Sequence, residues 1–159
     1  MDETYIRVKG KWAYLYRTVD STGATIDFLL AACRDAAAAK RFFQKALDAP
    51  GHPRPRVIHV DGNPSYPKVV AELKQERSLG RRCRCRTCPY LNNIVEQDHR
   101  AIKRRVNASQ GFRSFPGARR TIQGYEAVGM IRKGQVRWLP KGDVVGLVQF
   151  IPETLGLRG

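Results

Sequence analysis

Three acidic residues, far apart along the chain, have the side chains best suited to chemistry. Asp2 begins the first predicted strand, Asp61 follows a short apolar run at 57–60, and Glu96 lies within a helical pattern. Carboxylate oxygens are the ligands that Mg2+ prefers, and coordination positions remain open for phosphate and water. If folding brings the three residues together, they could hold the pair of divalent cations that phosphodiester chemistry uses.

Each of these residues also has an ordinary structural interpretation when it is taken alone. Asp61 opens the sequence Asp-Gly-Asn-Pro, in which an aspartate often only forms the turn. Glu96 shares a helix face with Arg100 and Lys103, as a solvated set of ion pairs would. A single acidic residue at the position of Asp2 commonly has no role. The three carboxylates are therefore informative only as a set.

The charge of the chain indicates what kind of partner it has. The 159 residues include 29 Lys and Arg against 14 Asp and Glu, a net charge of +15. Such an excess favours a polyanionic partner, and nucleic acid is the usual one. No apolar run approaches the roughly 20 residues that a membrane span needs, and Met1 is followed by two acidic residues rather than by a signal segment. A cytoplasmic protein without a membrane partner is expected.

Hydrophobic periodicity predicts the elements that must position the carboxylates. Alternation of apolar and polar side chains predicts an antiparallel three-strand meander at residues 5–8, 12–19 and 25–31. Three-to-four-residue spacing predicts helices at 36–47, 66–77, 92–106 and 118–132, and a buried strand is expected at 57–60. Asp35 is expected to cap the first helix. The sequence therefore predicts an α/β domain in which a mixed sheet is covered by helices.

Two further expectations concern burial. The face of the second strand that carries Trp12, Tyr14 and Tyr16 is expected to belong to the core rather than to a surface on which bases stack. Cys33, at the end of the third strand, is expected to be a small buried residue.

Three cysteines lie close together in a basic stretch, Cys83, Cys85 and Cys88. A zinc site with His99 as the nearest fourth ligand is one interpretation, although structural zinc sites usually bring two well-separated pairs. The preferred interpretation is that of free thiols in an exposed connector, where the flanking arginines would lower the thiol pKa and favour oxidation.

A series of short motifs follows along residues 2–134. They are Asp2-Glu-Thr-Tyr5, the run at 8–17, Asp61, Asn92-Asn93, Val95-Glu96, Asp98-His99, Lys103-Arg104, Gly111-Phe112 and Ile131-Arg-Lys-Gly134. Together they closely resemble the motifs of bacterial insertion-sequence transposases of the IS-six type. These enzymes belong to the DDE (Asp-Asp-Glu) superfamily. The 34 residues between Asp61 and Glu96 match the spacing of this group.

The resemblance implies a fold, a site and cofactors. It implies a ribonuclease H-like catalytic core at residues 1–134 and a C-terminal tail at 135–159. Asp2, Asp61 and Glu96 would then form a catalytic triad that binds two Mg2+ ions, for which Mn2+ can substitute. An enzyme of this kind nicks the ends of its element and joins the freed 3′-hydroxyl ends to target DNA.

The resemblance also implies partners. Lys103 would contact DNA near the cut end, with Arg100 and Arg104 as further candidates, and the protein would act as a homo-oligomer on the double-stranded DNA of element ends and target. The family places a helix-turn-helix region before the first motif, whereas this chain starts one residue before Asp2, so an N-terminally truncated copy is expected. Gly62 stands where many relatives have a lysine. Two alternatives remain open: a basic DNA-binding remnant without catalysis, and a ribonuclease H-like nuclease that cuts without joining.

Overall fold

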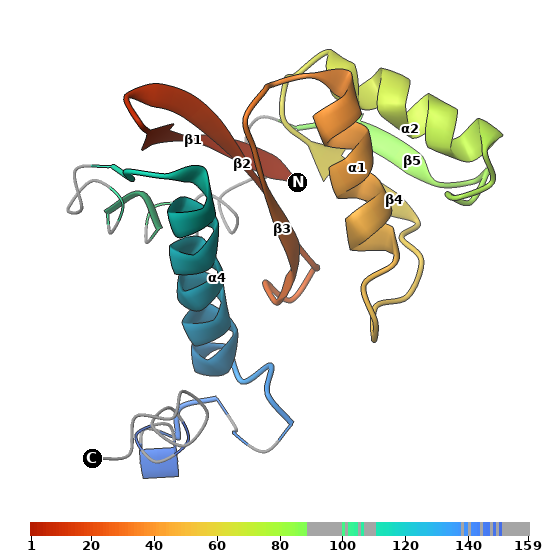
Figure 1. Ribbon diagram of the computed structural model, residues 1–159. Coiled ribbons are helices and arrows are strands. Elements are labelled where there is room, and N and C mark those ends of the chain that lie inside the picture. Colours follow the sequence, from red (N-terminus) through yellow and green to blue (C-terminus); the bar gives the residue numbers. More distant parts are fainter. Residues whose placement is uncertain are drawn as a thin grey trace. The chain divides into compact units, whose positions relative to one another are not determined.

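The computed structural model describes residues 1–88, 100, 102–104, 106, 111–137, 139, 141–143, 145–146, 148 and 150 (Figure 1). The chain divides into two compact units, Met1–Ala118 and Arg119–Gly159. Of the described elements, the first unit contains the five strands and helices α1 and α2, and the second contains most of helix α4 (Phe115–Arg132). The residues of interest for chemistry all lie in the first unit.

An antiparallel meander forms the beginning of the first unit, as predicted. Strand β1 (Asp2–Val8) pairs with β2 (Lys11–Val19), which pairs with β3 (Thr25–Ala31). The two residues between β1 and β2 both have positive φ, 51° at Lys9 and 73° at Gly10. A two-residue turn of this kind matches the twist of the flanking strands and sets their register.

Two further strands pair in parallel beyond helix α1. Strand β4 (Val57–Val60) pairs with β5 (Arg84–Thr87), with Val57 opposite Arg84 and Val60 opposite Thr87. The nitrogen of Met1 donates to the carbonyl oxygen of His59 at 2.7 Å, which connects the start of β1 with β4. Residues 84–87 are therefore a paired strand and not a connector, although Arg84, Arg86 and Thr87 are exposed, as expected.

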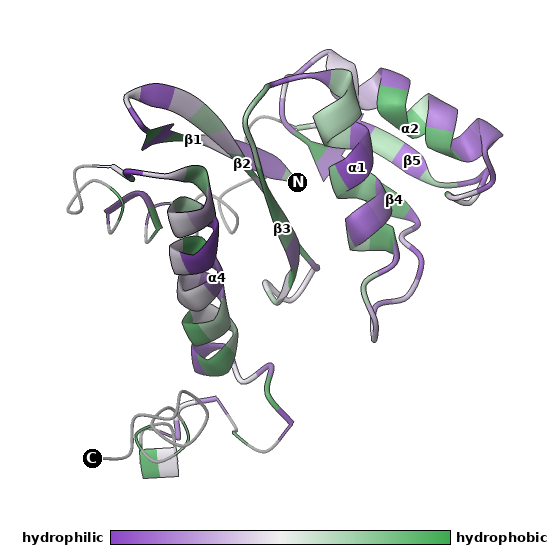
Figure 2. Ribbon diagram, in the orientation of Figure 1, coloured by the Kyte–Doolittle hydropathy of each residue, from purple (hydrophilic) through white to green (hydrophobic). Residues whose placement is uncertain are grey.

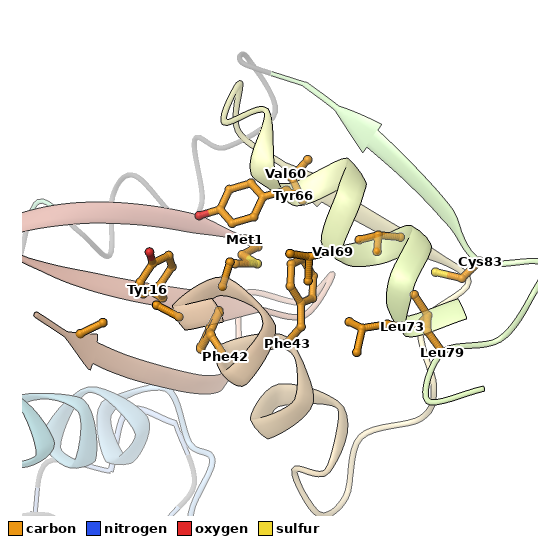
Figure 3. Packing of buried hydrophobic residues seen from close by; sticks show 14 residues of the cluster. Met1, Tyr16, Phe42, Phe43, Val60, Tyr66, Val69, Leu73, Leu79 and Cys83 are labelled. Atoms are coloured by element: carbon orange, nitrogen blue, oxygen red, sulfur yellow. The ribbon is translucent and has the colours of Figure 1, made fainter. Parts of the chain in front are cut away.

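Helices α1 (Ala36–Leu47) and α2 (Ser65–Gln75) supply most of the core. Helix α1 begins where predicted, because the Ala38 N–H donates to Asp35 Oδ1 at 2.6 Å and so caps the first turn. Both helices carry hydrophobic residues on one side and hydrophilic residues on the other (Figure 2). The Phe43 and Tyr66 rings meet edge to face at 5.9 Å, and this packing joins the two helices (Figure 3).

The face of β2 that carries Trp12, Tyr14 and Tyr16 is only partly buried. The expectation that it belongs to the core holds at Tyr16 but not at Trp12. Tyr16 is fully buried against Phe42, whose ring centroid lies 5.8 Å away. Trp12 is 53% exposed, and the guanidinium of Arg7 lies 4.9 Å from its ring centroid. Alternation along a strand identifies side chains that share a face, but α1 buries only the part of that face near Tyr16.

The predicted helix at 92–106 lies mostly outside the described residues. Positions 100, 102–104 and 106 are helical, and the side chains of Ile102 and Val106, one turn apart, are buried. The predicted helix at 118–132 is part of α4, which begins three residues earlier. In the part of the chain that the structure describes, no helix has the length and apolarity needed to cross a membrane.

Gly111 and Phe112 lie against the end of β1 within the first unit. Phe112 N–H donates to the carbonyl oxygen of Arg7 at 2.9 Å, and Lys9 N–H donates to that of Phe112 at 2.7 Å. Gly111 has φ +92°, and a Cβ there would lie 3.1 Å from the Arg7 carbonyl oxygen. A glycine is required at this position because both the backbone conformation and the close approach disfavour a side chain.

Candidate functional site

Asp2 and Asp61 lie at neighbouring ends of two strands. Asp2 is the first residue of β1, and Asp61 directly follows β4. The hydrogen bond from Met1 to His59 joins residues close to them in sequence. The structure thus brings together two carboxylates that are far apart along the chain.

The negative charge of Asp61 acts on the carboxyl group of Asp2. Burial raises the pKa of Asp2, and the negative charge of Asp61 raises this pKa further. Three features act in the opposite direction and lower the pKa of Asp2: a hydrogen bond of 2.8 Å from the Glu3 N–H to Asp2 Oδ1, then the positive charge of the Met1 amino group, then that of Lys103. A bound cation would relieve the repulsion between the two carboxylates, so this pair fits a divalent metal such as Mg2+.

Asp61 does form the turn that its sequence suggested. Its Oδ1 accepts a hydrogen bond from the Asn63 N–H at 3.1 Å, and Asn63 Oδ1 accepts one from the Ser65 N–H at 3.0 Å. These bonds lead the chain into α2. A carboxylate has two oxygens with about four acceptor sites, so a single turn bond leaves room for a cation. The turn role and a metal role are therefore compatible.

The third carboxylate of the predicted triad, Glu96, lies outside the described residues. Among the residues that are described, no group of three or more His, Cys, Asp and Glu side chains could hold a metal ion. The described portion of the candidate site is thus the pair of Asp2 and Asp61.

Lys103 lies where its charge reaches Asp2. It is helical and exposed, and its positive charge lowers the pKa of Asp2. Arg100 and Arg104 are also helical and exposed. Nothing in the described ranges connects either arginine with Asp2 or Asp61.

Sequence reasoning missed three residues beside the site: Glu3, Arg34 and Tyr66. The side chain of Glu3 is only 3% exposed and forms an ion pair with Arg34. The Tyr66 hydroxyl donates to Glu3 Oε2 at 3.2 Å. The sequence could have indicated Glu3, because Glu3 and Tyr5 are two residues apart in a strand and therefore lie on the same face. A charged residue on a face that packs against a helix calls for a partner.

The cysteines differ from the expectation. Cys83 is buried and Cys85 packs against the same core, and burial raises the pKa of both thiols. The expectation that these pKa values are lowered is wrong, because the burial of the two thiols outweighs the positive charges near them. His99, the suggested fourth zinc ligand, lies outside the described residues. Cys33 is exposed, which also corrects the expectation that it is buried.

This arrangement predicts an order of thiol reactivity. We expect iodoacetamide to modify Cys33 well before Cys83, because the thiolate is the reactive form and burial both raises the Cys83 pKa and blocks access. Mass spectrometry of samples quenched at increasing times measures the order. In denaturing urea the difference should vanish. Equal labelling rates in the native chain would contradict the burial of Cys83.

Comparison with known proteins places the chain in a family. Residues 1–135 match the sequence model of a family described as "DDE domain". The chain belongs to this DDE domain family, and the transposases among its curated relatives are of the IS-six type. The resemblance drawn from the motifs is confirmed at this level. No solved structure matches the chain.

The relatives include proteins of mobile elements in bacteria. The Staphylococcus aureus transposase for insertion sequence-like element IS431mec is 37% identical over 139 residues, which cover 87% of this chain and 59% of the relative. The S. aureus transposase for insertion sequence element IS257 in transposon Tn4003 matches with the same values. An uncharacterised Yersinia pseudotuberculosis protein is 36% identical over 85 residues, 53% of this chain and 79% of that protein. The chain spans about three-fifths of the length of the two transposases.

Proposed function

We propose that this chain is the catalytic core of a DNA transposase, formed by residues 1–134 and followed by a tail at 135–159. It nicks the ends of its element and joins the free 3′-hydroxyl ends to target DNA. The observation that carries the proposal is the meeting of Asp2 and Asp61 at adjacent strand ends in a chain of the DDE domain family.

A ribonuclease H-like sheet is part of the proposal. The meander β1–β2–β3 supports it, as do the parallel pair β4–β5 and the hydrogen bond from Met1 to His59 that connects β1 with β4. Among the described residues β1–β2–β3 and β4–β5 are two separate hydrogen-bonded sheets, and the proposal places them side by side in the mixed order β3-β2-β1-β4-β5. In this order the first and second aspartates of the triad come from neighbouring strands.

The proposed chemistry assigns a role to each site residue. Asp2, Asp61 and Glu96 hold two Mg2+ ions, or Mn2+ in their place. When bound, these ions neutralise charge at the phosphate and activate water or a 3′-hydroxyl. Asp2 is partly buried, so water screens its charge less than at the surface. Its electrostatic attraction for a cation is therefore stronger. Lys103, with Arg100 and Arg104, binds the DNA backbone through charge.

The proposed partner is double-stranded DNA, both at the element ends and at the target. The net charge of +15 supports this partner, and the protein acts on it in the cytoplasm. A homo-oligomer on the DNA is proposed as well, because transposition joins two ends to one target.

A joining assay tests this function against its alternatives. The chain is incubated with a labelled duplex that has a pre-cut 3′-hydroxyl end, a second duplex and Mg2+ or Mn2+. A covalent joint product that EDTA prevents is the expected result. Cutting without joining would favour a ribonuclease H-like nuclease. DNA binding without chemistry, unchanged by Asp61→Asn and Glu96→Gln, would favour a non-catalytic DNA-binding remnant.

Lys103→Ala is expected to weaken DNA binding by this chain. Removal of one phosphate contact should reduce the slope of log affinity against log salt by about 1. Fluorescence anisotropy with a labelled duplex at several salt concentrations measures the slope. Lys40→Ala is the matched control, because Lys40 already pairs with Glu72 and Glu76 and is not available to phosphate. An equal loss in both variants would show that only net charge matters.

A further inference from the structure

Glu3 is a buried carboxylate next to a candidate metal ligand. It follows Asp2 in β1, so its side chain lies on the opposite face of the strand. Only 3% of the Glu3 side chain is exposed. A charge so far from water is costly unless it is paired and hydrogen-bonded, and Glu3 has an ion pair with Arg34 and a hydrogen bond from Tyr66.

The two partners of Glu3 come from different parts of the first unit. Arg34 lies between β3 and α1, and Tyr66 is the second residue of α2, five positions after Asp61. Glu3 therefore connects the strand that carries Asp2 with the segment that follows Asp61. The Tyr66 ring is fully buried and packs edge to face on Phe43, so its hydroxyl has a defined position.

A continuous series of hydrogen bonds joins the two aspartates through Glu3. Asp2 Oδ1 accepts from the Glu3 N–H at 2.8 Å, and Glu3 Oε2 accepts from the Tyr66 hydroxyl at 3.2 Å. The Tyr66 N–H donates to the carbonyl oxygen of Asn63 at 3.2 Å, and the Asn63 N–H donates to Asp61 Oδ1 at 3.1 Å. Every link in this series is a direct contact between named atoms.

The hydroxyl of Tyr66 is suited to a permanent donor role. Burial raises the pKa of Tyr66, and the negative charge of Glu3 raises it further, so the hydroxyl keeps its proton. Arg34 compensates the charge of Glu3. Without Arg34, the negative charge of Glu3 would lie beside Asp2 and Asp61 with no ion-pair partner and would add to their repulsion.

We propose that Glu3 is a positioning residue that sets the separation of Asp2 and Asp61 through Tyr66, and thereby the affinity of the pair for divalent cations. This inference rests on the proposed function, because it assumes that the two aspartates are metal ligands. Residues that orient metal ligands in this way typically change metal affinity 10- to 100-fold when they are replaced. A purely structural role for Glu3 would instead lower stability and leave the affinity of the folded chain unchanged.

The test measures Mn2+ affinity of the folded chain. Free Mn2+ is followed by electron paramagnetic resonance during titration, at a temperature where circular dichroism shows each variant to be folded. Tyr66→Phe is the main variant, because it removes the hydroxyl and keeps the ring. We expect its Kd for Mn2+ to rise about tenfold or more. Glu3→Gln is the second variant and should raise the Kd in the same direction.

Leu73→Val is the matched control. Leu73 is a fully buried residue of α2, about two turns beyond Tyr66, and its truncation removes no hydrogen bond of the series, so the stability should fall while the Kd stays that of the wild type. A wild-type Kd in Tyr66→Phe, or an equal rise in Leu73→Val, would overturn the inference while leaving the metal site intact. If the wild type binds no Mn2+, or if Asp61→Asn binds it equally well, the proposed function fails and the inference fails with it.

Discussion

Replacement of Asp61 by asparagine is expected to abolish the thermal stabilisation that Mg2+ or Mn2+ gives the wild-type chain. A ligand that binds only the folded state stabilises it by about 2.7 kcal/mol at 100 times its Kd, which for a chain of this size is roughly 5–10 °C in Tm. Asparagine lacks the charge that a hard divalent cation needs. Differential scanning fluorimetry with and without metal measures the shift.

Without metal, the Asp61→Asn variant should not be less stable than the wild type. The asparagine introduced by Asp61→Asn would still accept the turn bond from the Asn63 N–H. Burial would still raise the pKa of Asp2, but the further rise that comes from the charge of Asp61 would be gone. We therefore expect the Tm of this variant without metal to be no lower than that of the wild type. Asp48→Asn, at the exposed end of α1, removes the same charge and should retain the metal shift.

Asp61→Asn should also remove the joining activity if the proposed function is correct. Loss of a group that stabilises charge in the transition state costs at least about 100-fold in rate. The joining assay with a pre-cut end gives this measurement. A metal shift that survives in Asp61→Asn, or joining at the wild-type rate, would show that Asp61 is only a turn residue.

Phe42→Ala is expected to cause the largest loss of stability. Phe42 is fully buried, and its ring lies against that of Tyr16 at 5.8 Å between α1 and the meander. Truncation of a buried phenylalanine to alanine costs about 3–5 kcal/mol, because it loses apolar burial and leaves a cavity. The total stability of a domain is only about 5–15 kcal/mol, so the variant should be close to unfolding at 37 °C.

Chemical denaturation followed by circular dichroism measures this loss. Arg41→Ala is the control, since it changes the neighbouring residue of the same helix at an exposed position and should stay within about 0.5 kcal/mol of the wild type. A loss in Phe42→Ala below about 1 kcal/mol would contradict the packing of α1 on β2, because deletion of a well-packed ring costs more than that.

Much of the local structure follows from the sequence alone. Alternating side chains identified the meander, and apolar spacing with an aspartate before it identified α1 and its cap at Asp35. These features depend on neighbours within a few residues, which is why pattern reasoning finds them. The sequence did not predict strand β5, because its arginines are typical of a polar loop. Only the structure shows that Cys85 packs against the core.

The residue types of the site and the family were also determined by the sequence. Asp2, Asp61 and the motifs around them identify the DDE domain family without any coordinates. What only the tertiary structure decided is that Asp2 and Asp61 meet, and that Glu3 and Tyr66 connect them. Those contacts join segments about 60 residues apart. Their existence depends on which distant strands pair and which faces α1 and α2 bury, and no local periodicity carries that information.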